Sequence, residues 1–356
     1  MDFQKAIIKF KKRVDREIEK QFNIVISEAR KSNELVADSL EYAKYILLSG
    51  GKRIRGALLY YGYVGAGGKD EKKIIKAAAA AEFGHLFVLM HDDIIDHGTL
   101  RHNVKTLHKK FSKRDLNNLS TWSERHFGES LALIIGDMIY AIMNKGILEA
   151  NFDQKATIQG LIQLHKVSIT TAIGQVQDIT MGCAKKITTT DVLDMYENKT
   201  ARYTFEGPLQ IGMMIAGCED KKILNNIRRY AIPIGIAFQI QDDILGIFGN
   251  EKKLGKSVAS DIEEGKNTLM VVKARELSST KQKKQLELIL GKKNISKKEI
   301  SIFKNILVET GALSYARKAV NDYLSEGKKQ MEKSLLPKET KQFLSGLIDY
   351  LEKREI

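Results

Sequence analysis

Apolar residues recur along most of this chain at intervals of three and four positions, the spacing of one face of an α-helix. No alternating apolar and polar pattern, as a β-strand would give, competes with it. Helices are therefore predicted at residues 3–30, 41–48, 54–64, 71–95, 127–150, 154–183, 189–216, 221–249 and 267–290, with two or three shorter ones over 296–354.

Composition supports long helices, because only 3 of the 356 residues are proline and 43% are hydrophobic. The polar stretch 109–125, which contains Trp122, is the best candidate for a loop. No linker divides the chain. The sequence therefore predicts one all-α domain over residues 1–356.

An acidic pattern occurs twice, at Asp92-Asp93 with Asp96 and at Asp242-Asp243, each time in an apolar run. Adjacent carboxylates in such a setting require a cation nearby. On a helix, Asp92 and Asp96 lie one turn apart on the same face. Two such faces turned toward each other would form a cage of oxygen ligands, which suits Mg²⁺ held together with waters and phosphates.

Basic residues accompany these carboxylates. Lys52 and Arg55 follow the turn Ser49-Gly50-Gly51 at a helix start, where backbone N–H groups also favour an anion. Further cations follow or separate the acidic motifs, at Arg101, Lys199, Lys256 and Lys266. Carboxylates that bind metal, combined with cations that bind phosphate, imply a substrate carrying diphosphate and Mg²⁺.

The net charge of +14 and the pI of about 9.4 raise the possibility of a nucleic-acid partner. No aromatic residues are interleaved with basic ones and no nucleic-acid motif occurs, so no such partner is expected. Cys183 and Cys218 lack metal-ligand spacing, and a cytoplasmic location with free thiols is expected. Gly, His or Asp interrupts the apolar stretches before 18 residues, so no transmembrane segment is predicted.

Taken together, these motifs resemble those of the trans-prenyl (polyprenyl) diphosphate synthases over about residues 40–275. The strings that carry the resemblance are GGKRIRG, HLFVLMHDDIID, Gly136-Asp137, GQVQD at 174–178, ENKTARYTFEGPL at 197–209, FQIQDDILGIFG and LGKSVASDIEEGKNT. The resemblance implies the isoprenoid synthase fold, a single domain of long, mostly antiparallel helices around a central apolar cavity, in a homodimer.

The resemblance also implies the reaction and its participants. Isopentenyl diphosphate would be condensed with an allylic diphosphate (dimethylallyl, geranyl or farnesyl), with three Mg²⁺ ions bound alongside the substrate. Metal ligands would be Asp92, Asp96 and Asp242. Isopentenyl diphosphate would be bound by Lys52, Arg55 and His85. The allylic substrate would be bound by Arg101, Lys199, Thr200, Gln239, Lys256 and Lys266, with Asp261 as an outer acid.

Two positions depart from the family pattern. His102 stands where the family commonly has a second arginine that helps to bind isopentenyl diphosphate, so it is expected to donate more weakly and with a charge that depends on pH. The second acidic motif ends in Gly246 instead of aspartate, which still leaves a usable site because Mg²⁺ keeps waters readily.

Product length is expected to depend on residues one to three turns before Asp92, because one isoprene unit is about as long as a helical turn, about 5 Å. Phe87 would place a ring across the channel, while Val88 and Gly84 would leave space beside and below it. In the family, one bulky residue at this level suggests a C20 product, so geranylgeranyl diphosphate is predicted.

Other readings remain open. The product could be farnesyl diphosphate or a prenyl diphosphate of C25 or longer. A class I terpene cyclase shares the acidic helix and Mg²⁺ but has no use for GGKRIR. A non-catalytic subunit of a heteromeric synthase typically loses Asp or Lys in these motifs, and here nearly all persist.

Overall fold

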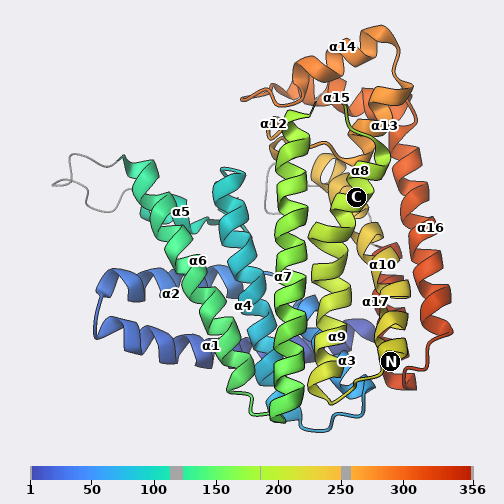
Figure 1. Ribbon diagram of the computed structural model, residues 1–356. Helices are drawn as coiled ribbons and strands as arrows, with labels where there is room; N and C mark the ends of the chain where they lie inside the picture. Colours follow the sequence, from blue (N-terminus) through green and yellow to red (C-terminus); the bar gives the residue numbers. More distant parts are fainter. Residues whose placement is uncertain (1, 113–122, 185, 250–257, 354–356) are drawn as a thin grey trace. The chain divides into compact units, whose positions relative to one another are not determined.

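The computed structural model describes residues 2–112, 123–184, 186–249 and 258–353, and it confirms the all-α prediction (Figure 1). The chain divides into two compact units. The N-terminal unit comprises Asp2–Leu161 and Ile211–Cys218, and the C-terminal unit comprises Ile162–Gln210 and Glu219–Ile356. The single domain over 1–356 stays a prediction.

The N-terminal unit contains six helices among its described residues and one short hairpin. They are α1 (Phe3–Arg30), α2 (Glu34–Leu48), α3 (Ile54–Gly65), α4 (Glu71–Ile95), β1 (Leu100–Arg101), β2 (Val104–Lys105), α5 (Leu107–Phe111) and α6 (Glu124–Leu148). Along the chain, α7 (Gln154–Cys183) begins in this unit and continues into the other, and α9 (Gly207–Ile215) begins in the other and ends here.

In the C-terminal unit, the described elements include a π-helix, labelled η1. They are α8 (Thr189–Tyr196), η1 (Glu197–Glu206), α10 (Lys221–Phe248), α12 (Ser260–Glu263), α13 (Leu269–Leu277), α14 (Thr280–Ile289), α15 (Lys297–Glu309), α16 (Ala312–Glu332) and α17 (Lys338–Glu352).

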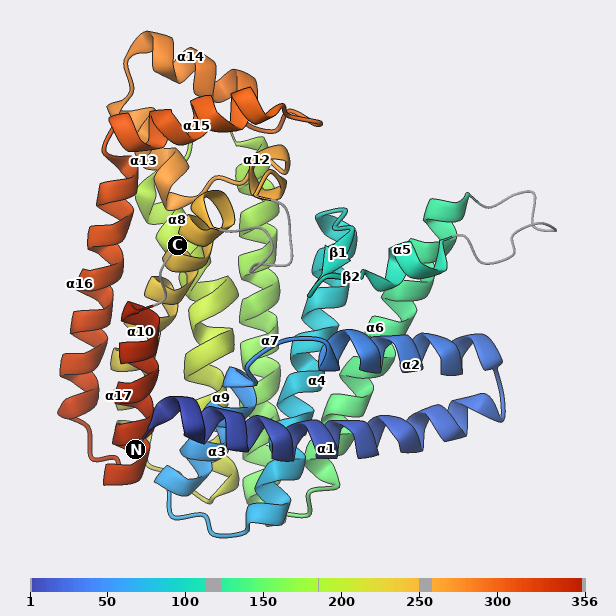
Figure 2. The same cartoon turned by 180° about the vertical axis from the view of Figure 1, so that it is seen from behind.

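Side-chain caps and buried faces explain the helices of the N-terminal unit. The Asp2 side chain accepts from the backbone N–H of Lys5 and begins α1, which lies beside α2 (Figure 2). The rings of Phe22 in α1 and Phe83 in α4 meet edge to face, with centroids 5.0 Å apart. The fully buried alanines 77–80 let other helices pack closely on α4, whose main partner within the unit is α6.

The core of the C-terminal unit is α10, which packs along α16 and η1 (Figure 1). Ile227, Tyr230, Ala231 and Ile240 of α10 are almost completely buried. Within η1, Arg202 donates to the carboxylate of Glu197 through Nε (3.0 Å) and Nη2 (2.6 Å). A π-helix, with its i→i+5 hydrogen bonds, accommodates a pair of side chains five positions apart.

Several predicted boundaries were wrong. The helix predicted at 41–48 begins earlier, at Glu34, because the Asn33 side chain accepts from the Val36 N–H and caps it. The segment predicted as one helix over 189–216 is α8, η1 and α9 in succession. The segment 267–290 is divided by a capping box at Ser279 into α13 and α14. In the predicted loop 109–125, α5 covers the first residues, and Trp122 lies outside the described residues.

Among the described residues, three helices are long and apolar enough to cross a membrane by length and composition alone, namely α4, α6 and α10. The expectation that polar residues interrupt every apolar run too early for a span was therefore too strict. Within the protein, 61% of the apolar window of α4, 50% of that of α6 and 67% of that of α10 are buried. The lack of a transmembrane segment stays a prediction.

Candidate active site

The predicted diphosphate-binding turn between α2 and α3 is held by a buried arginine. Gly51 and Arg53 both have left-handed backbones, with φ of 81° and 59°. The Arg53 side chain is 1% exposed, and its guanidinium donates to the Asp15 carboxylate (2.7 Å) and to the carbonyls of Gly50 (2.8 Å) and Leu47 (2.7 Å). Arg53 was not predicted as a site residue, and its contact with α1 gives no signal in the sequence.

Lys52 and Arg55, the predicted ligands of isopentenyl diphosphate, flank this buried arginine. The Lys52 residue is exposed and Arg55 is half-buried. Burial, reinforced by the charges of Arg55 and Arg101, holds the pKa of His85 well below its usual range. His85 is therefore neutral at pH 7, and Arg55 and Arg101 lie near enough to act on its charge.

In the first acidic motif, the two adjacent aspartates have different surroundings. Asp93 is buried and accepts from Arg101 through Nε (3.1 Å) and Nη2. Burial raises the pKa of Asp93 to about 6, although the Arg101 charge opposes the shift. Asp92 and Asp96 stay half-exposed at the end of α4, with the Asp96 N–H bonded to the Asp92 carbonyl (2.8 Å). Their role as the metal ligands of this motif stays a prediction.

Arg101 is positioned by the hairpin β1–β2. The hairpin pairs Arg101 with Val104, and the turn residues His102 and Asn103 have φ of 53° and 64°. Two positive φ values are typical of a two-residue type I′ turn, where Asn is favoured and His is tolerated. A guanidinium has five N–H donors, so the contacts with Asp93 leave donors for the predicted allylic diphosphate.

His102, which departs from the family pattern, lies against the diphosphate-binding turn. A Cβ atom at Gly50 would come within 2.8 Å of Cδ2 of the His102 ring. Burial, helped by the charges of Arg101 and Arg53, lowers the pKa of His102. The imidazole at this position is therefore neutral at pH 7.

Phe87, the predicted product-length residue, is half-buried in α4 and faces aromatic neighbours. Its ring centroid lies 4.7 Å from that of His91 and 5.0 Å from that of Tyr140 in α6. The prediction that Gly84 leaves open space was wrong, because a Cβ there would lie 2.5 Å from Sδ of Met143. Met143 of α6 thus fills the side of Gly84, which permits close packing of the two helices. Val88 is half-buried.

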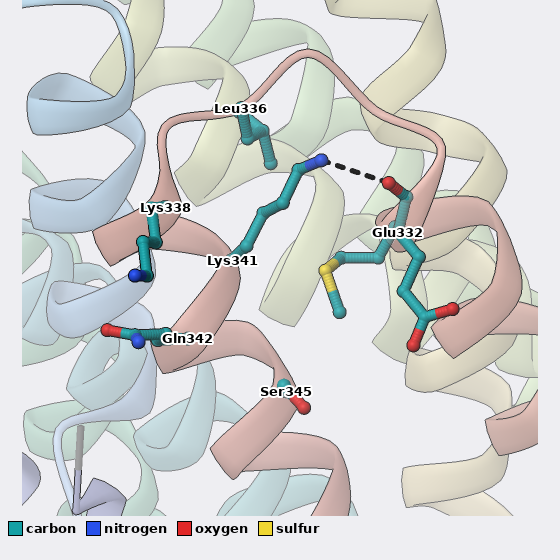
Figure 3. A pocket seen from close by; sticks show the side chains of 7 residues that line it. Glu332, Leu336, Lys338, Lys341, Gln342 and Ser345 are labelled. Atoms are coloured by element: carbon teal, nitrogen blue, oxygen red, sulfur yellow. Dashed lines mark hydrogen bonds between the residues drawn. The ribbon is translucent and has the colours of Figure 1, made fainter.

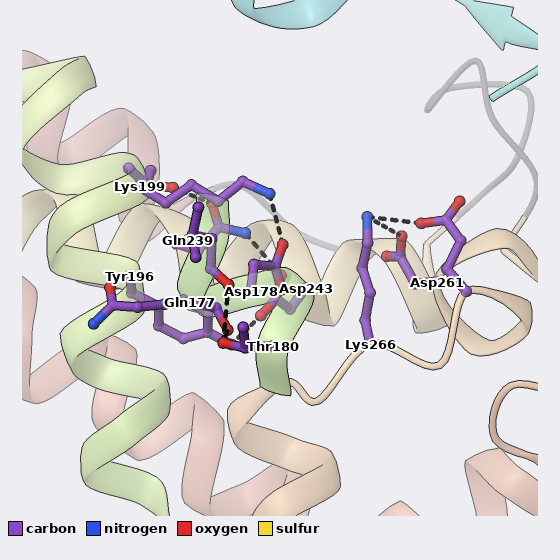
Figure 4. Close-up of polar contacts among 12 residues, drawn as sticks. Gln177, Asp178, Thr180, Tyr196, Lys199, Gln239, Asp243, Asp261 and Lys266 are labelled. Carbon is purple, nitrogen blue, oxygen red and sulfur yellow. Dashed lines mark hydrogen bonds and ion pairs between the residues drawn. The ribbon is translucent and has the colours of Figure 1, made fainter. Parts of the chain in front are cut away.

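The second acidic motif, in α10, repeats the division between the two aspartates. Asp243 is buried and accepts from Tyr196 Oη and from Gln239 Nε2 (2.8 Å) (Figure 4). Asp242 is half-exposed. Burial raises the pKa of Asp243 to about 7, although the hydrogen bond from Tyr196 opposes the shift. The amide oxygen of Gln239 in turn accepts from the Thr200 hydroxyl (2.7 Å).

The predicted lysines of this unit are ion-paired. Lys199 Nζ lies 2.6 Å from Asp178 Oδ2, and Lys266 Nζ lies 2.8 Å from Glu264 Oε2 and 3.6 Å from Asp261 Oδ1 (Figure 4). Binding of diphosphate would have to share or replace these contacts. Lys256 lies outside the described residues.

Sequence reasoning missed Asp93, Asp243, Asp178 and Tyr196 as members of the site. The neighbouring carboxylates signalled that some cation or donor must be present. They did not show that Arg101 and Tyr196 would supply it.

Within the described ranges, no three His, Cys, Asp or Glu side chains are gathered closely enough to hold a metal ion. The half-exposed carboxylates Asp92, Asp96 and Asp242 are nevertheless hard oxygen donors, which Mg²⁺ prefers. Each motif taken by itself offers an ion a carboxylate or two, and water and substrate phosphate would complete the shell. His and Cys, which softer metals prefer, were not predicted as ligands.

A hollow between the end of α16 and the start of α17 contains no predicted site residue (Figure 3). Lys341 Nζ reaches across it to the Glu332 carbonyl, at 2.9 Å. It is lined by Met331, Glu332, Leu336, Lys338, Lys341, Gln342 and Ser345.

Comparisons with known proteins agree with the motifs. A family model described as polyprenyl synthetase matches residues 37–307. A short chain isoprenyl diphosphate synthase of Methanocaldococcus jannaschii is 34% identical over 72% of each chain. A geranylgeranyl diphosphate synthase of Saccharolobus solfataricus is 31% identical over 86% of each chain. A crystal structure of a geranylgeranyl pyrophosphate synthase from Corynebacterium glutamicum, complexed with isoprenyl diphosphate and magnesium, has a TM-score of 0.91 at 25% identity and covers 98% of this chain and 99% of that one.

Proposed function

Because the chain belongs to the polyprenyl synthetase family, we propose that it is a trans-prenyltransferase that condenses isopentenyl diphosphate with an allylic diphosphate, namely dimethylallyl, geranyl or farnesyl diphosphate. The product proposed is geranylgeranyl diphosphate, with farnesyl diphosphate or a C25 or longer product as the alternative. One observation carries the proposal. In each acidic pair one aspartate is buried and hydrogen-bonded by protein donors, Arg101 for Asp93 and Tyr196 for Asp243, while Asp92 and Asp242 are partly exposed.

The proposal includes Mg²⁺ held by Asp92, Asp96 and Asp242, with three ions when substrate is bound. Bound Mg²⁺ would supply positive charge that stabilises the departing diphosphate. The protein adds cations of its own for the same diphosphate at Arg101, Lys199 and Lys266. Their carboxylate partners, Asp93, Asp178 and Glu264, hold these side chains in place before substrate arrives.

The reaction needs no side-chain nucleophile. The allylic C–O bond breaks, and its electron pair leaves with the diphosphate. The double bond of isopentenyl diphosphate, held by Lys52 and Arg55, then attacks the allylic cation and forms the new C–C bond. A neighbouring C–H bond breaks next. Its electrons form the new double bond, and its proton goes to the departed diphosphate. The oxygens of Thr200 and Gln239 are proposed to lie near the cation, where their partial negative charge stabilises it.

A homodimer is also proposed. In the C-terminal unit, α7 carries large apolar side chains that are 52–63% exposed at Ile162, Ile169, Ile173 and Val176. Their spacing of seven, four and three residues places them along one helix face. Apolar residues at this spacing form the contact face of paired helices. Such a stripe is costly in water, and a second copy of the chain is the proposed cover. A cytoplasmic location is proposed on the two free cysteines.

An assay with Mg²⁺, isopentenyl diphosphate and each allylic diphosphate tests the function directly. Asp92→Ala and Asp242→Ala should each lower kcat by about a hundredfold or more, because each removes charge stabilisation needed only in the transition state. Circular dichroism should show unchanged helix content. If either variant is folded and keeps near-normal turnover, the replaced aspartate is not a catalytic metal ligand.

The same assay separates the rival activities. A class I terpene cyclase would consume allylic diphosphate without isopentenyl diphosphate and release a hydrocarbon or alcohol. A non-catalytic subunit would give no product alone. Elongated prenyl diphosphate that requires both substrates is the outcome expected here.

A further inference from the structure

The start of η1 is held from one side by α7. Asn198 Nδ2 donates to Gln177 Oε1 (3.0 Å), and Lys199 Nζ donates to Asp178 Oδ2 (2.6 Å) (Figure 4). One turn earlier in α7, Gly174 lies against the η1 backbone. A Cβ there would stand 2.7 Å from Cα of Lys199 and 2.8 Å from the carbonyl carbon of Asn198. Only glycine allows this approach, because the obstructing atoms belong to the main chain.

From the other side, α10 repeats the arrangement. Thr200 Oγ1 donates to Gln239 Oε1 (2.7 Å). One turn earlier, a Cβ at Gly235 would stand 2.5 Å from Cβ of Ala201 and 3.1 Å from the Phe205 ring. Both helices thus present a glycine followed four residues later by a polar side chain, and residues four apart share one helix face.

This repetition bears on why the π-helix persists. π-helical turns are rare and occur mostly at functional sites, and unusual backbone persists only where its surroundings hold it. The backbone of residues 198–201 is confined by Gly174 and Gly235, and the side chains of 198–200 are fastened by Gln177, Asp178 and Gln239.

We propose that Gly174 and Gly235 are positioning residues for prenyl transfer. They let α7 and α10 close on the backbone of residues 198–201, and so determine where Lys199 and Thr200 meet the allylic substrate. Asp178, one turn after Gly174, is the third positioning residue, because it binds the Lys199 ammonium from the α7 side. The inference rests on the proposed function and adds to it residues that touch no substrate.

Gly174→Ala and Gly235→Ala test the proposal. An added methyl group must push the η1 backbone away, and a displacement of about 1 Å of a substrate-positioning group can cost about a hundredfold in rate. We expect kcat to fall at least about tenfold in both variants. The KM for isopentenyl diphosphate should stay unchanged, because its proposed ligands Lys52 and Arg55 belong to other elements.

Two further glycines of α7 provide matched controls. A Cβ at Gly182 would meet nothing within 4 Å, so Gly182→Ala should keep the wild-type kcat. A Cβ at Gly160 would meet only side chains, with Cγ2 of Ile215 2.6 Å away, so Gly160→Ala adds packing strain without touching η1. Gly160→Ala should lower the melting temperature and leave kcat unchanged.

A coupled pair of changes distinguishes positioning from loss of packing. Asp178→Asn alone should lower kcat with little effect on the KM for isopentenyl diphosphate. Gly174→Ala combined with Asp178→Asn should lose less than the product of the single losses, because both act through Lys199. If either glycine variant fails to fold, Asp178→Asn carries the test, and an unchanged kcat there overturns the proposal.

Three other outcomes would also overturn it. The first is that the glycine variants keep the kcat of Gly182→Ala. The second is that Gly160→Ala loses as much kcat as they do, which would tie the loss to stability. The third is that the double variant loses the full product of the two single losses. If the wild-type protein shows no prenyl transfer, the proposed function is wrong as well. An active wild type with unaffected glycine variants would remove this inference alone.

Discussion

At the scale of single residues, neighbouring aspartates in this protein are divided between two tasks. Asp93 and Asp243 are buried and satisfied by Arg101 and by Tyr196 with Gln239. A buried carboxylate is tolerated only with such partners. Because Arg101 and Gln239 are themselves proposed substrate residues, we expect the buried aspartate of each pair to orient the side chains around the exposed one.

His102→Arg should lower the KM for isopentenyl diphosphate several-fold, because a guanidinium adds a charge-assisted contact that a neutral imidazole cannot make. Because burial lowers the pKa of His102, its ring is neutral at pH 7, so the gain should be present at pH 7 as well as at pH 8. Steady-state kinetics against each substrate measure it. His102→Gln, a neutral donor, should give no gain. An unchanged KM in the arginine variant would mean that position 102 does not face this substrate.

His108 in α5 predicts a loss of stability in acid. It is 2% exposed, and neither ring nitrogen has a hydrogen-bond partner among the described residues. Burial lowers the pKa of His108 to about 4. Between that value and the unfolded value of about 6.5 the unfolded state binds more protons, so stability falls as pH falls through this window. At about 1.4 kcal/mol per pKa unit, the loss is at most about 3.5 kcal/mol.

Urea unfolding from pH 7 down to 4.5 measures this dependence. His108→Leu should unfold with a weaker dependence on pH than the wild type. The exposed His126 serves as the control, and His126→Gln should retain the wild-type dependence. Parallel curves for wild type and His108→Leu would contradict the prediction.

At the scale of elements, α4 carries Asp92, one of the proposed metal ligands, together with the proposed length residues. Phe87→Ala removes a ring one to two turns before Asp92, and the product should lengthen to C25 or beyond because each added unit gains apolar burial at about 25 cal/mol per Å². Met143 fills the side of Gly84, so Phe87→Ala with Met143→Ala should extend the product further. Val88→Phe should shorten it toward C15. Chromatography of the dephosphorylated products gives the lengths.

Destabilisation is the main confounding effect, because overpacking at Val88 can cost about 1–3 kcal/mol. Thermal unfolding must therefore show that each variant is folded. An unchanged product distribution in folded Phe87→Ala and Val88→Phe would place the end of the cavity on another element.

Helix positions could be predicted from sequence where one face is apolar over many turns, as in α1 and α10, and where a long apolar run lacks breakers, as in α4. The π-helix could not, because over ten residues its period is indistinguishable from that of an α-helix. The split between Asp93 and Asp92 was equally hidden. It depends on Arg101 being returned to α4 by a hairpin, whose two turn residues His102 and Asn103 carry only a weak local signal. Tyr196 and Asp15 reach their partners through tertiary packing, which leaves no trace in local periodicity.

At the scale of the whole molecule, the remaining prediction is the assembly of two copies through α7. Ile169 and Ile173 are 63% and 52% exposed and lie one turn apart on the proposed contact face. Replacing both with glutamate places carboxylates in a contact that should exclude water, and an unpaired charge there is strongly unfavourable. The double variant should therefore be a monomer at concentrations where the wild type is a dimer, as measured by sedimentation equilibrium. Leu288→Glu in α14, where the leucine is 66% exposed, should leave the dimer intact. A monomeric wild type, or a dimeric double variant, would mean that this stripe is covered by something other than a second copy of the chain.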